Sequence, residues 1–142
     1  MAIDKVLVKK IMISAPASKV WDALTNPKII NQWLFGTTVI SDWKPGSPIL
    51  FTGTWQGQEY QDKGTILQLE KEKKFQYNYW SGFSGLPDIG ENYSIIGFDL
   101  SPIESGTKLT LTHSHFPNET GYEHSDKNWD ASLALLKQVI EK

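Results

Sequence analysis

The sequence feature that most limits the possible folds is a change of hydrophobic period near residue 115. From residue 37 to about residue 115, apolar and polar side chains alternate with the period of a strand that buries one face. Turn-forming residues interrupt the alternation at residues 44–46, 70–74 and 104–106. An antiparallel sheet can keep one side in water, so the pattern predicts a meander of about six strands.

Large side chains recur on one face of each predicted strand, and we expect these faces to point into the core. Polar residues such as Gln76, Lys108 and Thr110 occupy the alternate positions. The inward sets are Ile49, Phe51 and Trp55; Phe75, Tyr77 and Tyr79; Ile96, Phe98 and Leu100; and Leu109, Leu111 and His113.

Helical patterns flank the meander. A predicted strand over residues 6–13 ends at a Ser-Ala-Pro sequence, and apolar residues at helical spacing follow it. A second helix start lies at Asn26-Pro27, so the pattern predicts two short helices. From about residue 123 to residue 141, apolar residues spaced by 4, 3 and 4 predict a longer helix. The sequence therefore predicts an α+β fold, in which a curved antiparallel sheet of about seven strands wraps around the C-terminal helix. Without a repeat or a linker-like segment, we expect residues 1–142 to form a single domain.

The charge balance argues against several classes of partner. Fourteen basic and 16 acidic residues give a net charge of −2, which would not attract nucleic acid.

No cysteine is present, so a disulfide, a thiolate nucleophile and a cysteine metal site are excluded. The first ten residues do not form a secretory signal, and no apolar run is long enough for a membrane span. We therefore expect a cytoplasmic protein that does not bind nucleic acid and does not span a membrane.

Motifs at both ends of the chain resemble those of a known family. The order of elements is similar to the helix-grip fold of START-like proteins, which include the Bet v 1 allergens and polyketide cyclases. The motifs are Ala15-Pro16, Val20-Trp21, Ala23-Leu24-Thr25, Pro27 and Trp33 at one end, and Gly106-Thr107, Leu109, Leu111, His113, Trp129, Leu133 and Leu136 at the other. These residues resemble those of the family named for the activator of the Hsp90 ATPase, and the resemblance implies a chaperone as one possible partner.

The candidate site is the aromatic interior. Two phenols that face a core, Tyr77 and Tyr79, need hydrogen-bond partners, which a cavity holding water or the polar end of a ligand would supply. His113 continues an inward-facing series, so it either pairs with a buried polar group or presents a donor to that cavity. The predicted cavity-lining residues are Trp33, Phe51, Trp55, Tyr77, Tyr79, Phe98, His113 and Trp129.

A metal site is the weaker interpretation of the histidines. His113 and His115 would share a strand face and could bind a metal together with His124 or Asp126, but no ligand spacing supports this. We therefore predict no metal, no cofactor and no catalytic residue.

Three functions remain open at the level of sequence. The first is non-catalytic binding of a small hydrophobic or aromatic molecule in an internal cavity. The second is an enzyme of cyclase, dehydratase or hydrolase type, in which His113 or a tyrosine would move protons. The third, which only the resemblance implies, is regulation of an Hsp90-type chaperone.

Overall fold

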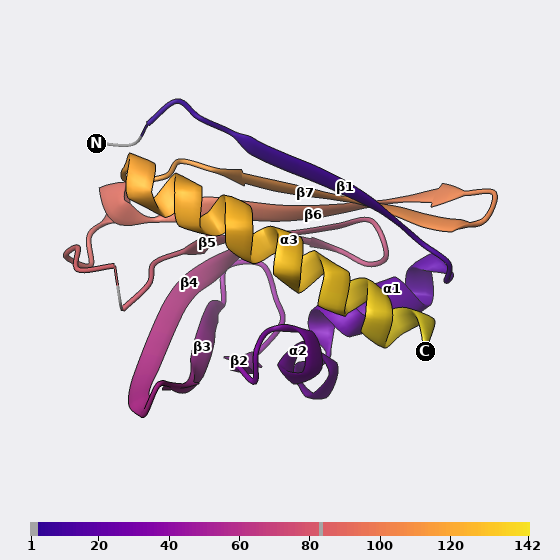
Figure 1. The fold of residues 1–142 in the computed structure, drawn as a ribbon, viewed down its shortest axis with the longest axis horizontal. Helices are drawn as coiled ribbons and strands as arrows, with labels where there is room; N and C mark the ends of the chain where they lie inside the picture. The colour runs from indigo at the N-terminus through magenta and orange to yellow at the C-terminus, as the bar shows by residue number, and fades with distance from the viewer. Residues whose placement is uncertain (1–2, 83) are drawn as a thin grey trace.

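Seven antiparallel strands form one curved sheet, and a long C-terminal helix lies across it (Figure 1). The structure is a computed structural model that describes residues 3–82 and 84–142. Its strands are β1 (Leu7–Ile13), β2 (Thr38–Ser41), β3 (Pro48–Trp55), β4 (Gln58–Glu70), β5 (Lys74–Tyr79), β6 (Ser94–Ile103) and β7 (Gly106–Ser114). The helices are α1 (Ala17–Thr25), α2 (Pro27–Trp33) and α3 (Glu119–Glu141), with a short 3-10 helix, η1 (Gly90–Asn92). The predicted fold class is confirmed.

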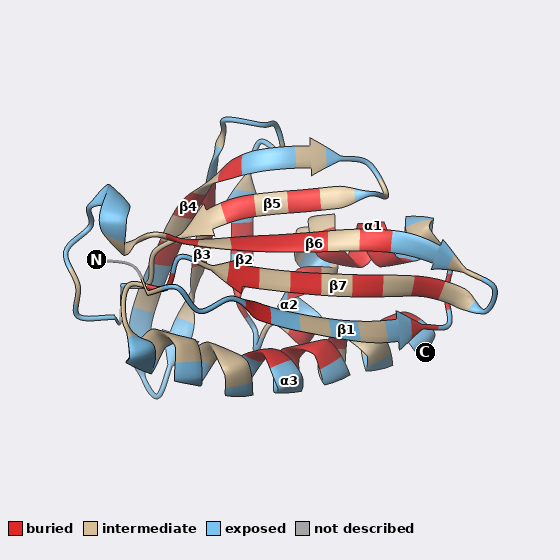
Figure 2. Cartoon of the chain, turned by 90° about the horizontal axis from the view of Figure 1, so that it is seen from above, coloured by how far each residue is buried: buried red, intermediate tan, exposed pale blue. Residues whose placement is uncertain are grey.

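The strand order is β1-β7-β6-β5-β4-β3-β2, so the first strand pairs with the last. β1 and β2, which α1 and α2 separate along the chain, form the opposite edges of the sheet. Buried and half-buried positions alternate along β7, as Figure 2 shows. The predicted inward series of β5, β6 and β7 is therefore found, and the register aligns Tyr77, Ile96 and His113 in one row across the three strands.

Helix α3 begins earlier than its apolar spacing predicted. The helix starts at Glu119, whereas the sequence pattern placed its start at about residue 123. Asn118 is the N-cap, and its side chain accepts a hydrogen bond from the Gly121 N–H at 2.8 Å. The first turn carries no apolar stripe, so periodicity could not reveal it.

Trp55 does not face the core, and the predicted inward orientation is wrong. Its side chain is 59% exposed, although it has the same strand parity as the buried Ile49 and Phe51. In the described part of the chain, the helices pack mainly on β1, β2, β6 and β7, whereas Trp55 lies next to the turn of the β3–β4 hairpin. Parity assigned Trp55 to the face of Ile49 and Phe51 but could not show that the core ends before this residue.

Candidate ligand-binding interior

Phe98 on β6 lies at the centre of the aromatic core. It is 2% exposed, and its ring lies edge-on to Trp33 of α2 at 6.5 Å and to Trp129 of α3 at 5.7 Å between centroids. Phe75 of β5 stacks on it at 6.1 Å. Two helices and one neighbouring strand thus converge on this ring of β6. The Trp33 indole donates a hydrogen bond to the Ala23 carbonyl at 2.8 Å.

A second aromatic group lies farther along the sheet. The Phe51 ring of β3 is 5.5 Å from Tyr77 and 5.6 Å from Tyr79, both on β5. Tyr77 also contacts Phe75 at 5.1 Å, which joins this group to the Phe98 cluster. The structure therefore brings seven of the eight predicted residues into or beside one aromatic interior and leaves Trp55 outside it.

This interior is filled almost completely by its own side chains. The space left between α1, α2 and the sheet has a volume of about 10 Å³, close to the least that can hold one water molecule. The expected cavity is therefore closed in this state. Its lining residues are Leu24, Ile30, Trp33, Leu34, Val39, Trp43, Ile49, Phe51, Phe75, Tyr77 and Phe98.

His113 uses both ring nitrogens within the core. Its Nδ1 accepts a hydrogen bond from the Trp129 indole N–H at 3.1 Å, because an indole can only donate. Its Nε2 therefore carries the proton and donates a hydrogen bond to Ser94 Oγ at 2.8 Å. Burial lowers the pKa of His113 to about 3. The imidazole is neutral, and it has no free lone pair with which to act as a base on a substrate.

Tyr79 is also satisfied within the protein. Its hydroxyl donates to the Asp62 carboxylate of β4, which also accepts the Gly82 backbone N–H at 2.9 Å. Burial, followed by the charge of Asp62, raises the pKa of the Tyr79 phenol well above its usual value. Sequence analysis missed Asp62, because the N-terminal half of β4 is mostly polar and lacks the alternation that would have marked an inward face.

The Tyr77 hydroxyl, unlike the polar groups of His113 and Tyr79, has no hydrogen-bond partner among the described residues. The Tyr77 side chain is 5% exposed. Every side-chain polar atom that is fully sequestered within the described residues has a partner, so the Tyr77 oxygen must retain contact with a water-sized space. Burial raises the pKa of this phenol, which therefore stays protonated at neutral pH.

The histidine pair is not assembled as a metal site. Within residues 3–82 and 84–142, no group of three or more His, Asp or Glu side chains could hold an ion. His115 has a left-handed backbone with φ of 59° and is exposed, and Asp126 pairs with Lys9 at 2.6 Å. The backbone turn at the end of β7 thus breaks the strand geometry on which the metal interpretation depended.

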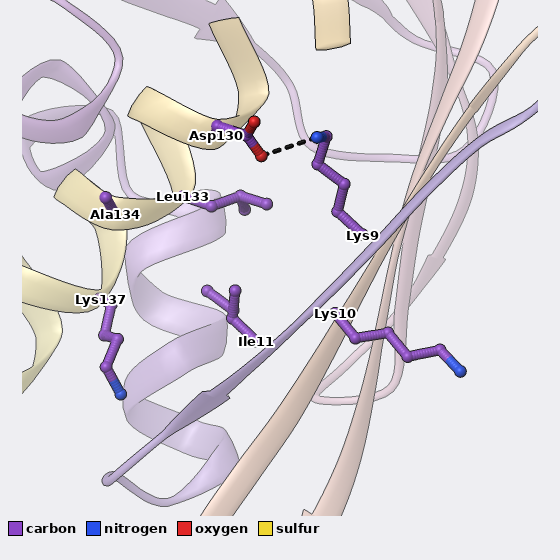
Figure 3. Close-up of a pocket in the computed structure, with 7 residues that line it drawn as sticks. All are labelled: Lys9, Lys10, Ile11, Asp130, Leu133, Ala134 and Lys137. Atoms are coloured by element: carbon purple, nitrogen blue, oxygen red, sulfur yellow. Dashed lines mark hydrogen bonds and ion pairs between the residues drawn. The ribbon is translucent and has the colours of Figure 1, made fainter. Parts of the chain in front are cut away.

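A larger hollow lies on the surface between β1 and α3 (Figure 3). Its volume is about 490 Å³, and Ile11 and Leu133 contribute apolar side chains to it. Two of its lysines are paired, since Lys9 pairs with Asp130 at 2.6 Å and Lys137 pairs with Glu141 at 2.9 Å. Lys10 also lines the groove, and no ion pair of the described residues includes it.

The architecture defines a helix-grip protein of the START-like class, in which a curved sheet holds a C-terminal helix over an aromatic interior. A family model described as "Activator of Hsp90 ATPase homolog 1-like protein" matches residues 14–141. The chain belongs to this family.

Solved structures of several bacterial proteins share the fold. A Cytophaga hutchinsonii protein is 42% identical, with a TM-score of 0.83 and coverage of 99% of this chain and 97% of the other. A Mesorhizobium loti protein is 24% identical, with a TM-score of 0.80 and 96% of each chain covered. CalU16 of Micromonospora echinospora is also 24% identical, with a TM-score of 0.71 and coverage of 95% of this chain and 74% of that one. The latter two similarities concern the fold alone.

No curated protein matches the chain. Among the helices of the described residues, none combines the length and apolar character needed to cross a membrane.

Proposed function

We propose that this protein binds a small, largely apolar molecule beside Tyr77, in the interior between the α1–α2 segment and the sheet. The observation that supports this most directly is the buried Tyr77 hydroxyl, which has no hydrogen-bond partner among the described residues. Because this hydroxyl faces a water-sized space and has no partner among the described residues, a ligand that pairs with it gains a specific hydrogen bond. The surrounding aromatic rings provide the apolar surface for the rest of the ligand.

Binding requires the interior to open, because its free volume is about 10 Å³. We infer that the segment from Leu34 to Trp43 moves. It contains β2, a four-residue edge strand that pairs with β3, and Leu34 and Trp43 are half-buried lining residues. Phe35 and Trp43 have φ angles of 53° and 57°, a conformation costly for residues other than glycine. A displaced segment would relieve this backbone strain.

Native mass spectrometry of the purified protein, followed by titration with hydrophobic probes, tests this function. We expect 1-naphthylmethanol to change the tryptophan fluorescence, because Trp33 and Trp43 line the interior. The absence of a co-purified molecule, together with no response to any apolar probe, would count against interior binding.

The Tyr77→Phe variant separates the hydroxyl from the ring. Removing the unpartnered oxygen should leave the free energy of unfolding unchanged or raise it, while 1-naphthylmethanol should bind about three- to tenfold more weakly. Urea denaturation and calorimetric titration measure the two quantities. In the matched Tyr79→Phe variant, loss of the hydrogen bond to Asp62 should cost about 1–3 kcal/mol of stability. If Tyr77→Phe bound the probe with unchanged affinity, the Tyr77 hydroxyl would not be part of the site.

The other two functions receive less support. His113 has both nitrogens engaged inside the core, so the proton-transfer role considered for an enzyme lacks a free group at that position. Chaperone regulation depends on the family description alone. A pull-down with an Hsp90-type chaperone, combined with an ATPase assay, tests that alternative directly.

A further inference from the structure

The Asp62 carboxylate is buried on the inner face of the sheet, and no cationic side chain of the described residues pairs with it. Its residue is 8% exposed. The sequence contains no arginine. Lys63 follows Asp62 in the chain, but it points to the other face of β4 and pairs with Asp88 at 2.5 Å. A buried carboxylate that lacks a cation is energetically costly and needs an explanation.

The hydrogen bonds within the protein account for where the Asp62 side chain lies, but they do not account for why this residue is an acid. Tyr79 and Gly82 both donate to the carboxylate, a pattern that suits an ionised group. An asparagine could also accept the Gly82 N–H and could bond the Tyr79 hydroxyl through its amide, without a charge to bury. Anchoring the loop after β5 therefore does not require an acid here.

Asp62 lies next to the proposed ligand site. It is the cross-strand partner of Phe51, whose ring contacts both Tyr77 and Tyr79. Tyr79, which bonds Asp62, is two residues from Tyr77 on the same inward face of β5. The unpartnered hydroxyl and the uncompensated carboxylate thus belong to one wall of the interior.

We propose that Asp62 receives a cationic group of the ligand, so that the molecules bound are apolar or aromatic amines. This inference rests on the proposed function and specifies its ligand class. The amine would donate hydrogen bonds to the carboxylate and supply the missing positive charge, while the aromatic rings hold the apolar part. Charge-assisted hydrogen bonds are about twice as strong as neutral ones, which gives selectivity for an amine over an alcohol of the same shape.

The test compares 1-naphthylmethylamine with 1-naphthylmethanol, which share one ring system and differ in charge. Calorimetric titration at neutral pH should give at least about tenfold tighter binding of the amine by the wild-type protein, as expected for a hydrogen bond to a charged group. In Asp62→Asn, which keeps the shape of the side chain, this preference should disappear while the alcohol binds as before. The exposed Asp42→Asn variant is the control and should retain the preference. The benzylamine and benzyl alcohol pair repeats the comparison with a smaller ring.

The amide signal of Gly82 provides a local readout, because this N–H donates to Asp62 at 2.9 Å. Amine binding should shift the Gly82 resonance in the wild-type protein more than alcohol binding does. Equal affinity of the wild-type protein for the amine and the alcohol, or a preference that survives in Asp62→Asn, would overturn the role of Asp62 and leave interior binding intact. If neither member of either pair bound, the proposed function itself would fail.

Discussion

Phe98→Ala should reduce the free energy of unfolding by about 3–5 kcal/mol, the range found when a buried phenylalanine is truncated. The Phe98 ring is 2% exposed and packs against Trp33, Phe75 and Trp129, which come from three different elements. Removing it leaves a cavity that the remaining rings cannot fill without moving. Because domains of this size are stable by only about 5–15 kcal/mol, the loss should be evident in urea denaturation followed by tryptophan fluorescence.

Two further measurements make the Phe98 result specific. Ile40→Ala on β2 removes a side chain that is 55% exposed and should change stability by less than about 0.5 kcal/mol. Benzene should raise the melting temperature of Phe98→Ala, because a dry apolar cavity of this kind binds small aromatic molecules. A loss below about 1 kcal/mol for Phe98→Ala would contradict the filled aromatic core, since truncation of a fully packed ring cannot be that mild.

The sequence predicted which side of the sheet each side chain faces better than it predicted the size of the internal cavity. Period-two alternation correctly placed Tyr77, Phe98 and His113 on the inner side of the sheet, because side-chain direction follows directly from strand geometry. Whether those side chains leave a cavity depends on rotamers and on contacts between distant segments. The free volume beside Tyr77 could therefore not be read from parity.

The polar partners of the interior were hidden for a similar reason. His113 is satisfied by Ser94 and Trp129, which belong to β6 and α3 and become its neighbours only through the register and the docking of the helix. Asp62 lies in a polar stretch of β4 that resembles a solvated strand, and only pairing with β3 and β5 encloses it. Long-range packing, rather than local pattern, determines which polar groups become buried.

A second large effect is expected when the pH is lowered, and it comes from His113. The folded protein holds this imidazole neutral, and burial lowers its pKa from 6.5 to about 3. Nδ1 of His113 now accepts a hydrogen bond from the Trp129 N–H. Protonation would place a hydrogen on Nδ1, so that two donors would face each other. In the unfolded chain the histidine binds a proton below about pH 6.5, so the unfolded state takes up more protons than the folded state between pH 6.5 and 3. The contribution of His113 to stability is complete above pH 6.5 and is lost as the pH falls through this window.

The magnitude follows from linkage, at about 1.4 kcal/mol for each pH unit within the window. Between pH 7 and pH 5, the wild-type protein should therefore lose about 2 kcal/mol of unfolding free energy through His113. Urea denaturation at a series of pH values measures this slope, and His113→Gln should flatten it even though the variant is less stable at neutral pH. The exposed His124→Gln variant should retain the wild-type slope. Parallel pH profiles for the wild-type protein and His113→Gln would show that the imidazole is protonated without disrupting the core, and the neutral hydrogen-bonded arrangement described for His113 would then be wrong.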